Sequence, residues 1–331
     1  MALIALAADK GSPGVTTAAV ALAALWPRRA LLAETDPAGG DLIYRSVGID
    51  HRPLDPGTGI LSLAATARRG IAAEQLWDHA QRLSGGLDVL VGLAAAEQAA
   101  GLTGQWGALG KAFGELARSP HQEAAADVLA DCGRLGPDSP AQALLPHAAL
   151  VLLLTRTQPE NIAHVRDRAA ALHSRLHGQQ RGAQPGRTAV GVLLVADAQR
   201  GAKVAAQVDE MLIASGSGAR VAGVLADDPA GAEQLAGRRR GRLDKSLLVR
   251  SARRVVADLH QNYRAELSPS GGAGQDRVQP PAPGAPGTPG APAPPGGAPP
   301  PAGYGPPAPS PTVPPQHRRP PAQPHGPGGA R

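Results

Sequence analysis

The chain has 331 residues, of which 42% are hydrophobic, so it is long enough for one large domain or two small ones. Its formal net charge of +6 is modest and by itself indicates no class of partner. Cys132 is the only cysteine, which excludes an intrachain disulfide and favours a reducing compartment. No apolar run approaches the roughly 18 residues that a membrane span needs, so we expect a cytoplasmic protein without a transmembrane segment.

Short apolar runs alternate with helix-like stretches along most of the chain. Seven runs that are apolar nearly throughout predict strands covered on both faces, at residues 3–8, 30–33, 87–91, 128–130, 150–154, 190–195 and 221–225. Helical patterns predict helices at residues 16–25, 71–83, 159–176 and 202–213. This alternation predicts an α/β fold with a doubly wound, mostly parallel sheet and helices on both faces.

The composition changes abruptly after Leu267. The remainder is rich in Pro, Gly and Ala, holds 22 of the 34 prolines and has almost no large apolar side chain. Such a segment cannot form a core. We therefore predict a folded domain at residues 1–267 and a disordered tail at residues 268–331, which serves as a flexible spacer or offers proline-rich segments to a protein partner.

Ligands of doubly wound sheets bind in the loops beyond the carboxyl ends of the strands. The first such loop, "KGSPGVTT" at residues 10–17, contains Gly11 and Gly14, which permit unusual backbone angles and let amide groups face an anion at the start of the next helix. Thr16 or Thr17 could place a hydroxyl on a magnesium ion. A routine glycine turn is the alternative interpretation of this loop alone.

Three later loops place carboxylates at strand ends. They are "AETDPAGGD" with Asp36, "LADCG" with Asp131, and "VLADDP" with Asp228 and Pro229. An aspartate opposite a phosphate loop can hold magnesium directly or through water. An aspartate at a strand end also commonly caps a helix, but four such loops in this order favour a common site.

Together these motifs resemble the ParA and MinD-like ATPases, a family of P-loop proteins with a deviant Walker A motif. The first loop matches the family signature at Lys10, Gly11, Gly14, Thr16 and Thr17. Ser12 replaces the second glycine of the signature, and Val15 replaces the Walker lysine. The resemblance covers about residues 1–263.

The resemblance implies ATP and magnesium as cofactors and a role for each matched residue. Lys10 corresponds to the signature lysine, which in the family reaches across a nucleotide-sandwich homodimer to the partner's phosphates. Asp36 corresponds to the residue that positions the attacking water. Thr16 and Asp131 correspond to the magnesium ligand and the Walker B acid. The region of Asp228 and Pro229 corresponds to the part of the family fold that helps hold the adenine, and Gly11, Ser12, Gly14 and Thr17 belong to the phosphate loop.

Val15 departs from the family where the departure matters most. The Walker lysine balances charge on the β and γ phosphates as phosphoryl transfer proceeds, and valine cannot. A lost charge-assisted hydrogen bond costs roughly 1.5 to 3 kcal/mol. We therefore expect weak nucleotide binding and slow or absent hydrolysis.

Eight basic residues crowd into a short region near the end of the domain. They are Arg238, Arg239, Arg240, Arg242, Lys245, Arg250, Arg253 and Arg254. Such a patch can contact DNA phosphates without sequence preference, although a solvated cluster without a partner is as plausible. Two functions follow: a nucleotide-switched positioning protein that binds DNA, or a catalytically degenerate scaffold or localisation factor for pilus or secretion machinery.

Overall fold

Eight strands form a single sheet in the computed structural model, which describes residues 1–178 and 188–268. The strands are β1 Leu3–Ala8, β2 Ala30–Glu34, β3 Gln81–Arg82, β4 Asp88–Leu90, β5 Asp127–Arg134, β6 Leu150–Arg156, β7 Ala189–Ala196 and β8 Ala219–Ala226. Their spatial order is β3-β4-β2-β5-β1-β6-β7-β8, and only the short edge strand β3 runs antiparallel to its neighbour. The predicted doubly wound, mostly parallel sheet is confirmed.

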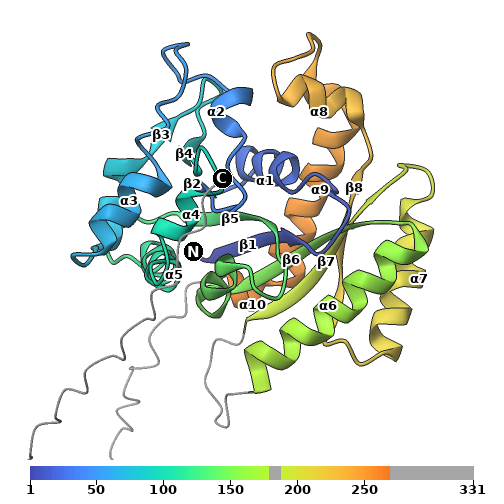
Figure 1. Cartoon of the computed structure of the whole chain (residues 1–331). Coiled ribbons are helices and arrows are strands. Elements are labelled where there is room, and N and C mark those ends of the chain that lie inside the picture. The colour runs from blue at the N-terminus through green and yellow to red at the C-terminus, as the bar shows by residue number, and fades with distance from the viewer. Residues whose placement is uncertain (179–187, 269–331) are drawn as a thin grey trace, which may run out of the picture. The chain divides into compact units, whose positions relative to one another are not determined.

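Helices cover both faces of this sheet (Figure 1). The α-helices are α1 Val15–Ala24, α2 Leu42–Arg45, α3 Ile60–Ala67, α4 Gln98–Gly101, α5 Trp106–Leu116, α6 Pro159–Gly178, α7 Gly201–Ala214, α8 Pro229–Leu235, α9 Leu247–Asn262 and α10 Arg264–Leu267. Three 3-10 helices, η1 Ala73–His79, η2 Pro140–His147 and η3 Leu243–Lys245, complete the described part of the chain.

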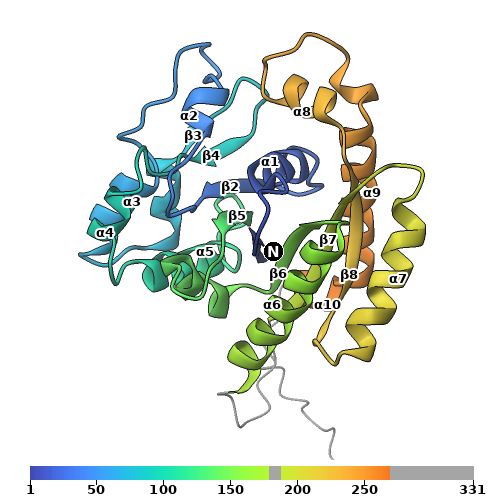
Figure 2. The same cartoon turned by 45° about the vertical axis from the view of Figure 1, so that its right-hand side comes forward.

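The strands bury alternate side chains in two cores. In β1, Leu3 belongs to the core beneath α3, α5, α6 and α7, whereas Ile4 belongs to the core beneath α1 and α9. Figure 2 shows α7 and α9 running along β8, and the residues that they bury belong to these two different cores. Burial on both faces explains why the parallel strands are apolar nearly throughout.

The predicted strands are all present, and several are longer than predicted. β5, for example, extends to Arg134, and its residues continue to pair with β1 as far as Ala8. This extension is important because it brings the end of β5 next to the start of the first loop, which follows Ala8.

The helix predicted at residues 71–83 is wrong. That segment forms η1 and then β3, which pairs with β4 through Gln81 and Arg82. Ala80 is already extended, and the turn that follows closes with a hydrogen bond from the Gly86 amide to the Leu83 carbonyl. Pairing with a neighbouring strand therefore overrides the local helical pattern.

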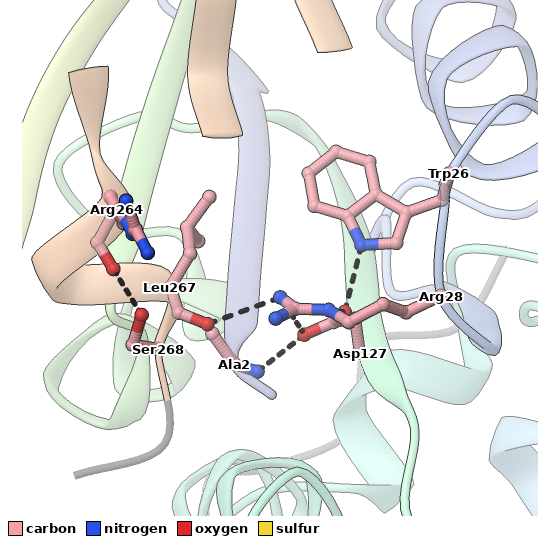
Figure 3. Close-up of polar contacts among 7 residues, drawn as sticks. All are labelled: Ala2, Trp26, Arg28, Asp127, Arg264, Leu267 and Ser268. Atoms are coloured by element: carbon pink, nitrogen blue, oxygen red, sulfur yellow. Dashed lines mark hydrogen bonds and ion pairs between the residues drawn. The ribbon is translucent and has the colours of Figure 1, made fainter. Parts of the chain in front are cut away.

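A buried polar cluster lies at the amino end of β5, opposite the carboxyl edge of the sheet (Figure 3). Asp127 accepts hydrogen bonds from the Ala2 amide at 2.6 Å, from Trp26 Nε1 at 2.8 Å and from Arg28 Nε at 2.7 Å. Arg28 also donates to the carbonyl of Leu267 at 3.1 Å. The cluster thus joins β1, β5, the end of α1 and the end of α10.

The predicted disordered tail, residues 268–331, lies outside the described residues except for Ser268.

Candidate functional site

A cavity of about 580 Å³ opens at the carboxyl edge of the sheet, beside the first loop. Its wall combines residues from three of the four predicted loops with residues that the sequence did not single out. The lining includes Ser12, Gly14, Thr16, Thr17, Asp36, Gly133, Arg134, Arg45 and Arg238. The structure therefore brings the glycine loop, the "ETDPAGGD" segment and the end of β5 together at one site.

The backbone of the first loop adopts left-handed conformations at Gly11 (φ 85°), Ser12 (φ 42°) and Gly14 (φ 93°). Ser12 keeps this conformation although serine lacks the freedom of glycine, and such residues carry strain on the order of 1 kcal/mol or more. No side chain caps the start of α1, and its first turn holds no acidic residue. The first amides of α1 are therefore left for an anion in the cavity.

Val15 brings no charge to the cavity. Its side chain is 7% exposed and packs in the core beneath α1 and α9. The loop thus combines left-handed backbone at Gly11, Ser12 and Gly14 with an apolar side chain at position 15.

Asp131 lies between the sheet and α1 and is not among the residues that line the larger cavity. It is 1% exposed; Oδ1 accepts a hydrogen bond from the Gly133 amide at 3.0 Å, whereas Oδ2 is buried without a hydrogen-bond partner. Burial raises the pKa of Asp131 to about 7, and the negative charges of Glu34 and Asp36 add to this rise. The Thr16 hydroxyl lies close enough to oppose the rise but does not complete a hydrogen bond to Oδ2.

The unpartnered oxygen of Asp131 fits a magnesium site. Oxygen ligands from one carboxylate and one hydroxyl, with the remainder from water and phosphate, are typical of magnesium bound with nucleotide. Within residues 1–178 and 188–268, no three His, Cys, Asp or Glu side chains gather into a metal cluster. A site supplied largely by Thr16, Asp131 and a bound phosphate needs no such cluster.

Two carboxylates of the second loop have different surroundings. Glu34 accepts hydrogen bonds from the amides of Asp41 at 2.7 Å, Leu42 at 3.1 Å and Gly92 at 2.9 Å, so it fixes the loop that follows β2. Burial raises the pKa of Glu34, and these amides oppose the rise. Glu34 therefore acts as a structural clamp and does not line the cavity.

Asp36 does line the cavity. Its Oδ1 accepts a hydrogen bond from the Ala38 amide at 2.8 Å, and its carboxyl group lies against Gly133 so closely that a Cβ at position 133 would overlap it. Burial raises the pKa of Asp36, while the charge of Arg134 lowers it. Gly133 has a φ of 56°, so both its backbone and this close approach require glycine.

Lys10 is exposed and lies outside the cavity. Its Nζ is 3.4 Å from Nε2 of His164 on α6, and the adjacent Asp9 forms an ion pair with Arg168 on the same helix at 2.5 Å. The side chain of Lys10 is therefore held toward α6 and not over the phosphate loop of its own chain.

A second cavity of about 240 Å³ adjoins the other side of the first loop. Asp228 and Pro229 line it together with Ser12, Gly14 and Thr17. The structure thus brings the fourth predicted loop to the same edge of the sheet.

Asp228 also holds two helices in place. It caps α8 by accepting a hydrogen bond from the Gly231 amide at 2.9 Å, and it accepts another from the Leu248 amide of α9 at 3.1 Å. Partial burial acts to raise the pKa of Asp228, but these amides outweigh it and the pKa lies below its usual value. This carboxylate shapes the second cavity mainly by positioning backbone.

The predicted basic patch is exposed along the α8–α9 connection and on α9. All eight residues are exposed: Arg238, Arg239, Arg240, Arg242, Lys245, Arg250, Arg253 and Arg254. Arg238 pairs with Glu233 at 2.7 Å and also lines the larger cavity, and Arg242 pairs with Asp244 at 3.1 Å.

The sequence did not indicate Arg45 and Arg134 as cavity residues. For Arg134, its position just after "ADCG" is the signal that could have indicated it.

Structural comparison identifies the fold as that of the MinD and ParA ATPases. The cell division ATPase MinD from Pyrococcus furiosus matches with a TM-score of 0.57 and 15% identity over 79% of this chain and 99% of that chain. A ParA family ATPase from Chlorobium tepidum TLS matches with a TM-score of 0.55 and 15% identity over 77% and 98%. The septum site-determining protein MinD from Pyrococcus horikoshii OT3, complexed with Mg-ADP, matches with a TM-score of 0.55 and 13% identity over 80% and 98%.

No protein-family model matches the sequence, and no match is found among curated proteins. At 13 to 15% identity the structural similarity establishes the fold, and activity has to be argued from the site. Among the helices of residues 1–178 and 188–268, none combines the length and the hydropathy that crossing a bilayer requires.

Proposed function

We propose that this chain is a nucleotide-binding positioning protein of the MinD and ParA type, which holds Mg-ATP in the larger cavity and hydrolyses it slowly or not at all. The observation that carries the proposal is the buried, unpartnered Oδ2 of Asp131 near Thr16, a residue that lines the larger cavity just after a loop with left-handed glycines. A buried carboxylate oxygen without a partner is unfavourable, and an incoming cation relieves it.

In this proposal, different residues contact the phosphates, the magnesium ion and the base. The backbone amides of residues 11, 12 and 14–17 bind the phosphates, since Pro13 has no N–H to donate. Thr16 and Asp131 hold magnesium, and the second cavity beside Asp228 and Pro229 receives the base. Magnesium supplies charge neutralisation for the phosphate oxygens. Asp36 lies on the cavity wall, where it can orient a water molecule.

Val15 sets the limit on catalysis. The loop contributes no cation to balance charge that develops on the phosphates, so turnover falls well below that of a protein with lysine in this place. The same observation favours a second candidate function, a scaffold or localisation factor that keeps the fold without its chemistry.

The proposal extends to partners. Lys10 is exposed and directed away from its own cavity, which suits a contact with a second copy of the chain in a homodimer. The exposed basic patch suits nonspecific contacts with DNA phosphates.

Calorimetric titration of the full-length protein with ATP, with and without magnesium, tests the proposal. We expect a micromolar Kd with magnesium, weakened at least tenfold by Asp131→Ala, and an affinity of the variant that no longer depends on magnesium. Asp138→Ala, which removes an exposed carboxylate, is the matched control and should bind as the wild type does. Absence of heat at millimolar Mg-ATP would reject nucleotide binding and leave the scaffold function.

A further inference from the structure

Three arginines line the larger cavity, and they differ in their ion pairs. Arg45 pairs with Asp41 in α2, and Arg238 pairs with Glu233 in α8. Among the described residues, Arg134 has no carboxylate within ion-pair distance. The guanidinium of Arg134 is therefore the cavity's unpaired cation within this part of the chain.

The backbone fixes where this cation sits. Arg134 is the last residue of β5 and pairs in register with Ala8, the last residue of β1 before the first loop. It follows Asp131 by three residues on the same strand. The carboxyl group of Asp36 lies against Gly133, the residue before Arg134, and the charge of Arg134 lowers the pKa of that group.

The same cavity lacks a cation in the usual place. Val15 is buried in the core, and Lys10 is held toward His164, so the first loop offers only amides and hydroxyls to an anion. A triphosphate carries up to four negative charges, more than loop amides and one divalent cation neutralise. A guanidinium is always charged and can donate two parallel hydrogen bonds to phosphate oxygens.

We propose that Arg134 supplies the positive charge for the terminal phosphates of a nucleoside triphosphate, in place of the lysine that is missing at position 15. The inference rests on the proposed nucleotide binding and assigns its cationic contact. Since Arg134 enters from β5 and not from the loop, it belongs to the segment that carries Asp131. Loss of the γ-phosphate would therefore remove a contact at the end of this strand.

Arg134→Ala tests the assignment, with Arg134→Lys as the conservative variant. Titration with Mg-ATP and Mg-ADP should give a ten- to hundredfold loss of ATP affinity in Arg134→Ala, a smaller loss of ADP affinity and an intermediate loss in Arg134→Lys. Arg69→Ala removes the same charge from an exposed site just after α3, outside both cavities and the basic patch, and should leave both affinities within twofold of wild type. Because Arg134 is exposed, we expect all three variants to keep the wild-type melting temperature within a few degrees.

A rescue experiment separates charge from structure. In the double variant Val15→Lys with Arg134→Ala, the lysine should restore ATP affinity to within a few fold of wild type. Nucleotide binding that is unchanged in Arg134→Ala would overturn this inference while leaving the proposed function in place. An equal loss of ATP and ADP affinity, accompanied by a lower melting temperature, would also overturn it. Failure of the wild type to bind any nucleotide would overturn both.

Discussion

Asp131 of β5 and Glu34 of β2 pair in register on neighbouring strands. The number of hydrogen bonds that each carboxylate accepts distinguishes their roles. Three amides satisfy Glu34, so its charge is used to hold the loop after β2. Asp131 receives one amide, and one of its oxygens is left without a partner. A chain that needed only a stable fold would gain from replacing this carboxylate, which is why we assign it to a ligand.

This difference predicts a pH dependence of stability. Burial raises the pKa of Asp131 to about 7 from a usual value of 3.8, so between these values the folded protein holds a proton that the unfolded chain has released. The free energy of unfolding should therefore fall as the pH rises through this window. Asp131→Asn cannot ionise, so between pH 5 and pH 8 its free energy of unfolding should fall by about 3 kcal/mol less than that of the wild type.

Denaturant unfolding at the two pH values, in the absence of nucleotide, measures this effect. Asp138→Asn changes an exposed carboxylate and should retain the wild-type dependence. An equal loss in Asp131→Asn and wild type would mean that Asp131 is ionised in the folded protein throughout this range.

At the level of strands and helices, the sequence predicted those elements whose pattern of apolar residues follows from burial. Strands covered on both faces must be apolar along their length, so β1, β6 and β7 could be recognised without knowledge of their neighbours. Burial likewise follows the sequence pattern in α9, where Leu248, Ala252, Val255 and Leu259 repeat at helical spacing and all four are buried.

What depends on pairing and register could not be predicted. Residues 71–83 have a helical pattern, yet Gln81 and Arg82 pair with β4. No feature of the local sequence indicates this strand pairing. The site shows the same limit. Loop composition indicated Thr16, Asp36 and Asp131, whereas the positions of Arg45 and Arg134 on the cavity wall depend on how α2 and β5 end relative to the first loop.

In the whole molecule, β5 connects the candidate site at the carboxyl edge of the sheet with a structural polar cluster at the opposite edge. Its carboxyl end carries Arg134 on the cavity wall and the buried Asp131 three residues before it, and its amino end carries Asp127 in the cluster of Figure 3. That cluster ties the end of α10 to the first strand through Arg28 and the Leu267 carbonyl. The final short helix is thereby attached to the centre of the sheet, far along the chain from its polar partners.

Asp127→Ala should consequently be severe. The carboxylate is fully buried, and its removal leaves the Ala2 amide, Trp26 Nε1 and the Arg28 guanidinium without their acceptor. We expect a loss of about 3 to 5 kcal/mol in the free energy of unfolding, the range for breaking a buried ion pair. Asp244→Ala, which breaks the exposed pair with Arg242, should cost less than about 1 kcal/mol. Denaturant unfolding compares the two variants, and a similar small loss in both would reject the structural role assigned to Asp127.

Hydrogen exchange of backbone amides in the full-length protein, with and without saturating Mg-ATP, shows whether nucleotide binds in the cavity formed by the first loop, Asp36 and the end of β5. If it does, we expect slower exchange in residues 131–135 and in residues 11–17 other than Pro13, which has no amide hydrogen. Exchange along the exposed face of α9 should be unchanged. Unchanged exchange at residues 11–17 under saturating Mg-ATP, or protection confined to other segments, would contradict nucleotide binding in this cavity.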